Sequence, residues 1–95
     1  MPFASPVERH LAQALARTLR ERRTEIGLTQ EEVAEAVGIS RNHYGLYESG
    51  LGNRPARAPL NPTLATLVAI ADALHLSLPD LIDRVYELPP RERSA

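Results

Sequence analysis

Apolar residues recur at three- and four-residue steps along most of the chain, with polar residues between them. This spacing places the apolar side chains on one face of an α-helix, whereas no segment shows the β-branched alternation of a strand. The pattern therefore predicts an all-α fold. Five helices are expected, at about 6–26, 30–37, 41–49, 64–74 and 78–86.

Capping residues support these boundaries. A Ser or Thr precedes each helix, and its side-chain oxygen can accept a hydrogen bond from a first-turn backbone N–H. The five expected caps are Ser5, Thr29, Ser40, Thr63 and Ser77. Only Gly38 and Ile39 separate the second helix from the cap of the third. A link this short forces the second and third helices to cross steeply.

The apolar stripes identify a candidate core. The residues expected to face inward are Val7, Leu11, Ala14, Leu15, Thr18, Leu19 and Ile26 in the first helix, Val33, Ala34 and Val37 in the second, Tyr44 and Tyr47 in the third, Leu64, Leu67, Ile70, Ala71 and Leu74 in the fourth, and Leu78, Leu81, Ile82 and Val85 in the fifth. In the long first helix, Val7, Leu11 and Leu15 have no obvious partner within a five-helix monomer. We expect them to pack on the fifth helix or on a second subunit.

Length and composition narrow the class of protein. Ninety-five residues leave room for a single domain over 1–95, with a core at about 6–86 and a flexible tail at 87–95. The absence of cysteine excludes disulfides, thiolate zinc sites and a cysteine nucleophile, and it suits a reducing compartment. No apolar run approaches the roughly 20 residues that cross a bilayer, and no signal peptide is visible. We therefore expect a cytoplasmic protein without a membrane partner.

No pattern in the sequence indicates catalysis. His10, His43 and His75 lie on separate helices or turns without metal-ligand spacing. No Ser-His-Asp arrangement, phosphate-cradling glycine loop or pair of carboxylates in an apolar pocket can be argued. The sequence thus predicts neither an enzyme nor a metal or other cofactor.

The charge total hides an uneven distribution. Eleven basic residues, all of them arginine, stand against twelve acidic ones, so the formal net charge is −1. This total argues mildly against a nucleic-acid binder, which is often basic overall. However, residues 41–61 carry three arginines and one glutamate, whereas residues 58–95 carry three arginines and five acids. The sequence therefore predicts a mildly basic end and an acidic end.

The stretch from Leu19 to Gly50, LRERRTEIGLTQEEVAEAVGISRNHYGLYESG, resembles the helix-turn-helix of the Cro/lambda-repressor (XRE) family. The later NPTLATLVAIADALHLSLPDLI is similar to the fourth and fifth helices of that family, so the resemblance covers about two-thirds of the chain. It implies a five-helix lambda-repressor-like DNA-binding domain. Here the first helix is extended, and the loop between the third and fourth helices is enlarged by roughly eight residues.

The resemblance places the third helix, about 41–49, in the major groove of a palindromic operator. Arg41 and Asn42 suit this role, because Arg can pair with guanine O6 and N7, and Asn with adenine N6 and N7. Gly45 would permit close approach to the DNA, and Leu46 would touch a thymine methyl. These four residues are the candidates for base reading.

Further residues are expected to contact the DNA backbone. The resemblance implies this role for Gln30, at the start of the second helix, where the family residue also braces the third helix. Thr29, His43 and Ser49 are expected nearby. Arg54 and Arg57, in the enlarged loop, either reach phosphates or the minor groove, or are simply solvated.

Arg23 and Glu48 match the buried ion pair that joins the first and third helices in the family. The resemblance gives this pair a structural role. It would fix the orientation of the third helix, and removing one partner would leave a buried charge unpaired.

The resemblance also implies a homodimer formed through the last helix. The candidate interface consists of Leu78, Leu81, Ile82, Val85 and Tyr86. The sequence therefore predicts a dimeric transcriptional regulator, most simply a repressor, on the double-stranded DNA of the nucleoid. The alternative is a protein-binding module on the same fold, an antitoxin or adaptor whose partner is a toxin or another protein.

Overall fold

The computed structural model describes residues 6–50 and 62–86, with side chains from Arg9 onward in the first range. These residues form five α-helices: α1 (Pro6–Ile26), α2 (Gln30–Val37), α3 (Arg41–Ser49), α4 (Leu64–Ala73) and α5 (Leu78–Val85). No strand occurs within the two ranges, which confirms the all-α prediction. The expected loop at 51–61, with Arg54 and Arg57, and the tail at 87–95 lie outside the described residues.

The predicted caps of α2 to α5 form as hydrogen bonds. Thr29 Oγ1 accepts from the Glu32 backbone N–H at 3.0 Å, and Glu32 Oε1 accepts from the Thr29 backbone N–H at 2.8 Å, which completes a capping box. Ser40, Thr63 and Ser77 accept equivalent first-turn bonds. Gly38 ends α2 in the left-handed conformation, with φ of 91°.

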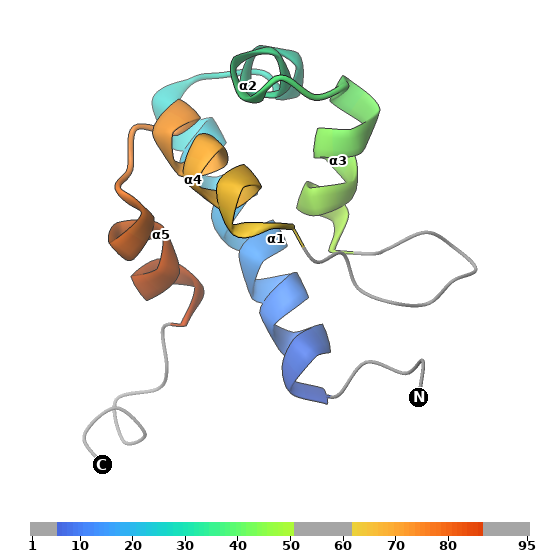
Figure 1. The fold of residues 1–95 in the computed structure, drawn as a ribbon, viewed down its shortest axis with the longest axis vertical. Helices are drawn as coiled ribbons and strands as arrows, with labels where there is room; N and C mark the ends of the chain where they lie inside the picture. Colours follow the sequence, from blue (N-terminus) through green and yellow to red (C-terminus); the bar gives the residue numbers. More distant parts are fainter. Residues whose placement is uncertain (1–5, 51–61, 87–95) are drawn as a thin grey trace.

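Helix α1 runs through the middle of the molecule, with α3 and α5 on opposite sides and α2 across one end (Figure 1). Helix α2 packs against both α3 and α4, and α4 packs against α5. The side chains at the centre come from all five helices. The largest fully buried ones are Leu19, Val33, Tyr44, Ile70, Leu74 and Leu81.

The extended part of α1 packs within the monomer. Ala12 and Ala16 are buried beneath the end of α3, where a Cβ built on Gly50 would lie 3.4 Å from Ala16 Cβ. Leu11 and Leu15 are half-buried against the common core. Leu11 and Leu15 therefore pack inside one chain, whereas the side chain of Val7 lies outside the described residues. The spacing of the larger apolar residues gave no indication of the contacts of the two alanines.

Among the predicted core residues whose side chains are described, one is exposed. Leu64 is 67 % exposed, and Val68, one turn further along α4, is 48 % exposed. Leu64 is the first residue of α4 and lies on the same face of that helix as Val68. Helical spacing alone does not show that this face is exposed.

The turn between α4 and α5 is fastened to α1 by Arg22. Its Nε donates to the Leu74 carbonyl at 2.9 Å and its Nη2 to the His75 carbonyl at 3.1 Å. His75 has a φ of 60°, a conformation that is unfavourable for a residue with a Cβ and here leaves the two carbonyls facing Arg22.

Among the described helices, none is by itself long and apolar enough to cross a membrane. Helices α4 and α5 meet that test only as a pair bent by 98°.

Candidate nucleic-acid interface

Helix α3 separates a polar side from a core side. Tyr44 and Tyr47 are buried and hold the core side in place. Arg41 and Asn42 are exposed in the first turn, and Gly45 and Leu46 are half-buried on the same side. The structure thus brings the four predicted base-reading residues together on one surface of α3.

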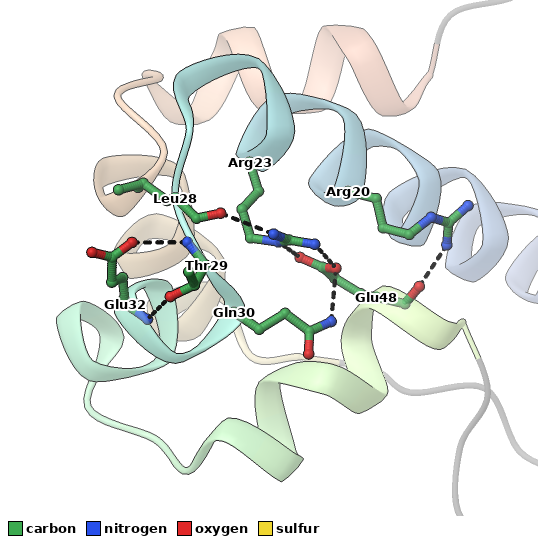
Figure 2. Close-up of polar contacts among 7 residues, drawn as sticks. All are labelled: Arg20, Arg23, Leu28, Thr29, Gln30, Glu32 and Glu48. Atoms are coloured by element: carbon green, nitrogen blue, oxygen red, sulfur yellow. Dashed lines mark hydrogen bonds and ion pairs between the residues drawn. The ribbon is translucent and has the colours of Figure 1, made fainter.

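Glu48 anchors α3 to α1 from within the protein. Its side chain is only 2 % exposed, and both carboxylate oxygens accept hydrogen bonds from Arg23. Arg23 Nε donates to Oε2 at 2.7 Å and Arg23 Nη2 donates to Oε1 at 3.1 Å (Figure 2). Arg23 Nη1 also donates to the Leu28 carbonyl at 2.9 Å, which ties the turn before α2 to the same point. The structure therefore contains the ion pair that the sequence resemblance implied.

Helix α2 reaches the same carboxylate through Gln30. The Gln30 Nε2 donates to Glu48 Oε1 at 2.9 Å, and the Gln30 Oε1 lies 3.6 Å from where a Cβ on Gly45 would be. An amide nitrogen carries two N–H donors, so one remains for another acceptor. Gln30 therefore braces α3, as the family resemblance implied.

Burial and hydrogen bonding act in opposite directions on the charge of Glu48. Burial alone raises the pKa of this carboxyl, but hydrogen bonds from Arg23 and Gln30 outweigh that effect, and the pKa lies below its ordinary value. The hydrogen bond with Glu48 raises the pKa of Arg23. Both groups are therefore charged at neutral pH and form an ion pair.

Tyr44 lies beside this ion pair with its ring in the core. Burial and the neighbouring Glu48 raise the pKa of Tyr44 far above its usual range, so the phenol stays neutral. The hydroxyl is buried and faces the carboxylate, but it makes no well-formed hydrogen bond to any described residue. Tyr44 is therefore a core residue with its hydroxyl at the polar edge.

The remaining backbone-contact candidates lie around these residues. Thr29 is exposed and its Oγ1 is occupied by the capping box. His43 is exposed, and its ring lies tilted by 34° against that of Tyr47, with the ring centroids 5.1 Å apart and its Nε2 3.2 Å from the Tyr47 hydroxyl. Ser49 Oγ donates to the Leu46 carbonyl at 2.7 Å.

Sequence reasoning missed Arg20. Its Nη1 donates to the Glu48 backbone carbonyl at 2.6 Å and so secures the last turn of α3 (Figure 2). The signal was present in the sequence, because Arg20 and Arg23 are three residues apart and share one side of α1.

The proposed dimer surface needs correction. Leu81 is 0 % exposed and Val85 is 7 % exposed, and both belong to the monomer core. These two residues therefore do not supply surface to a partner. Leu78 and Ile82 are half-buried, and Tyr86 is 52 % exposed.

No group of three or more potential metal ligands occurs among the described side chains.

Comparison with known proteins agrees with this geometry. A family model described as a helix-turn-helix domain matches residues 14–85. The control protein C.SmaI from Serratia marcescens is 34 % identical over 84 residues, which span 88 % of this chain and 90 % of C.SmaI. The transcriptional repressor RstR of the cryptic phage CTXphi, from Vibrio cholerae, is 41 % identical over 66 residues, or 70 % of this chain. The matched part is about half of RstR, at 52 %.

Solved structures give the same result. The clp gene regulator ClgR from Corynebacterium glutamicum is similar with a TM-score of 0.65 and 27 % identity, over 79 % of this chain and 71 % of ClgR. The restriction-modification controller protein C.AhdI from Aeromonas hydrophila gives a TM-score of 0.59 and 31 % identity, over 74 % of this chain and 94 % of C.AhdI.

The fold, with its exposed α3, is that of the helix-turn-helix regulators. The chain belongs to the helix-turn-helix domain family, and its resemblance to the Cro/lambda-repressor type is confirmed.

Proposed function

We propose that this chain represses transcription by binding a palindromic operator with α3 in the major groove. The observation that carries the proposal is the exposed side of α3, which a buried network fixes against α1 and α2. A recognition helix must be presented at one angle to read base edges. The Glu48 network supplies that rigidity, because three helices converge on one carboxylate.

The roles of the α3 residues follow from their chemistry. Arg41 is proposed to read a guanine and Asn42 an adenine, since both side chains are exposed at the start of the helix. Gly45 permits close approach, and Leu46 contacts a thymine methyl.

Backbone contacts position the helix. The second N–H of the Gln30 amide is proposed to donate to a phosphate while the first holds Glu48. Thr29, His43 and Ser49 are proposed as neighbouring backbone contacts. Arg54 and Arg57 are also proposed to contact the DNA backbone, and this proposal rests on the sequence alone.

We propose a twofold dimer, because a palindrome requires two reading helices about one turn, roughly 34–36 Å, apart. Tyr86 is the most exposed apolar side chain described at the end of α5, and the half-buried Leu78 and Ile82 lie on the same helix. Such a protein would act on nucleoid DNA in the cytoplasm.

Selection of bound duplexes from a random DNA library tests this function. We expect enrichment of an inverted repeat whose half-site spacing fits one helical turn. The Arg41→Ala variant, selected in parallel, should enrich a consensus degenerate at one position in each half-site. Failure of the wild-type protein to enrich any sequence would refute the proposal.

One observation supports a second candidate function. Leu64 and Val68 form an exposed apolar pair four residues apart on α4, and such a pair suits a protein partner such as a toxin. A partner of this kind would co-purify at equal stoichiometry and would be unaffected by Arg41→Ala. Loss of the partner on Leu64→Ser with retention of DNA binding would separate the two functions.

A further inference from the structure

Apart from Arg41 on α3, the arginines of the described residues fall into two groups. Arg22, Arg23 and Arg84 each form an ion pair with a glutamate. In contrast, Arg9, Arg17 and Arg20 are exposed on α1 and have no ion pair with any described side chain. Three guanidinium groups are therefore presented to solvent by one helix without neutralisation.

These three arginines share one side of α1. At about 100° per residue, Arg9, Arg20 and Arg17 fall within about 80° of the helix circumference, with Gln13 between them. The rise from Arg9 to Arg20 is about 17 Å. We call this surface, formed by Arg9, Gln13, Arg17 and Arg20, the arginine face. Glu21 is the one described exposed acid beside it on α1.

The arginine face is continuous with the recognition helix. Arg20, at one end, donates to the carbonyl of Glu48 in the last turn of α3. The adjoining edge of α1, with Ala12 and Ala16, packs beneath Gly50 at the end of α3. Because α1 is one uninterrupted helix, the arginine face is held rigidly beside the C-terminal end of α3.

The other described helices are acidic on their exposed sides. Helix α2 presents Glu31, Glu32 and Glu35 and carries no basic residue. Helices α4 and α5 together carry three aspartates, Asp72, Asp80 and Asp83, against Arg84 alone. A polyanion is therefore attracted to the side of the molecule formed by α1 and α3.

We propose that the arginine face is a second, sequence-independent contact to the DNA backbone, beyond the base pairs that α3 reads. The proposal rests on the DNA binding proposed above. Guanidinium groups are weakly hydrated planar donors that match phosphate oxygens. A DNA strand carries one phosphate per about 3.4 Å of duplex axis, so a face about 17 Å long spans several of them.

Salt-dependent binding of the full chain tests the proposal. Fluorescence anisotropy with a labelled 40-base-pair duplex of arbitrary sequence is measured from 50 to 200 mM KCl. If Arg9 and Arg17 each neutralise a phosphate, the Arg9→Gln/Arg17→Gln variant loses about 1.8 from the slope of log affinity against log salt. Over this fourfold range, the wild-type protein then loses about twelvefold more affinity than the variant.

A matched control isolates position from net charge. Arg17→Gln and Arg84→Gln each remove one exposed positive charge, but Arg84 lies on the acidic side. We expect Arg17→Gln to reduce the slope by about 0.9 and Arg84→Gln to leave it unchanged. The variants of Arg9 and Arg17 should keep the wild-type circular dichroism and melting temperature, because neither side chain contacts a described partner. Arg84→Gln removes the 3.6 Å ion pair with Glu25, which is exposed on both sides and contributes little to stability.

The outcomes distinguish this proposal from the function on which it rests. An unchanged slope for the double variant, with wild-type duplex binding intact, would overturn the arginine-face contact and leave the proposed function standing. Equal slope losses for Arg17→Gln and Arg84→Gln would also overturn it, since net charge alone would then explain the effect. Absence of wild-type binding to any duplex would refute the function itself.

Discussion

Arg23 and Glu48 form a two-point ion pair, with nitrogen–oxygen distances of 2.7 and 3.1 Å, between the middle helix α1 and the exposed helix α3. Gln30 adds a third bond to the same carboxylate from α2, and Arg20 holds the Glu48 carbonyl. The orientation of α3 relative to the rest of the domain therefore depends on one buried acid.

Replacing Glu48 with alanine should destabilise the protein strongly. The substitution leaves the Arg23 guanidinium without its acidic partner, and breaking a buried pair from one side costs about 3 kcal/mol or more. Glu35→Ala is the control, because Glu35 is exposed on α2 and makes no described ion pair. Urea unfolding of both variants measures the difference. Equal midpoints for the two variants would contradict a central role for the pair.

The same carboxylate should make stability depend on pH in the acid range. The pKa of Glu48 is lower in the folded protein than its ordinary value of 4.5, so folding favours the carboxylate. The resulting stabilisation is fully present at neutral pH and is lost as the pH falls below about 4.5 through the folded pKa. Urea midpoints recorded between pH 7 and pH 3 measure this loss.

The Glu48→Gln variant is the control for the pH dependence. Glutamine keeps the shape of the side chain but does not titrate, so the acid loss of stability should be smaller than in the wild-type protein. Identical pH profiles would assign the effect to other groups, such as Glu25, whose pKa is also lowered, first by its hydrogen bond with Arg22.

The local signals in the sequence predicted the helices well, because each boundary depends on residues near it. Thr29 and Glu32 cap α2, and Gly38 ends it, without help from the rest of the chain. The ion pair of Arg23 with Glu48 joins residues 25 positions apart, and it was accessible only through the family resemblance.

Two features could not be predicted because they depend on how the helices meet. Leu81 and Tyr86 both belong to apolar patterns, but only the packed structure shows one in the core and the other exposed. Ala16 carries too little apolar surface to mark a contact, although it lies beneath Gly50. The arginine face, in contrast, was open to prediction, because the spacing of Arg9, Arg17 and Arg20 already places them on one side of a single helix.

Arg41→Ala should relax sequence preference. If Arg41 reads one guanine with two hydrogen bonds, its loss removes about 1–3 kcal/mol of discrimination at that base. Affinities for the selected operator and for single-base variants at each position measure the effect. Arg84→Ala, on the other side of the molecule, should leave all ratios unchanged. A uniform loss across every sequence would instead assign Arg41 to phosphate contact.

Exposed Tyr86 and buried Leu81 should respond differently to truncation. Leu81→Ala removes fully buried side-chain volume and should cost about 2–5 kcal/mol of folding stability. Tyr86→Ser should leave the fold intact, as judged by circular dichroism, but weaken self-association if α5 forms the dimer. Sedimentation equilibrium at several concentrations measures association. An unaltered monomer–dimer equilibrium in Tyr86→Ser would place the dimer contact elsewhere.

Gly45→Ala separates stability from DNA contact at a single position. A Cβ at residue 45 would lie 3.6 Å from Gln30 Oε1, an ordinary contact, so alanine fits the free protein. Because alanine favours a helix by up to about 1 kcal/mol over glycine, the melting temperature should rise. If the glycine permits close approach to the major groove, affinity for the operator should fall at the same time. A higher melting temperature with unchanged affinity would show that the glycine does not contact the DNA, since the added methyl group would then meet nothing in the complex.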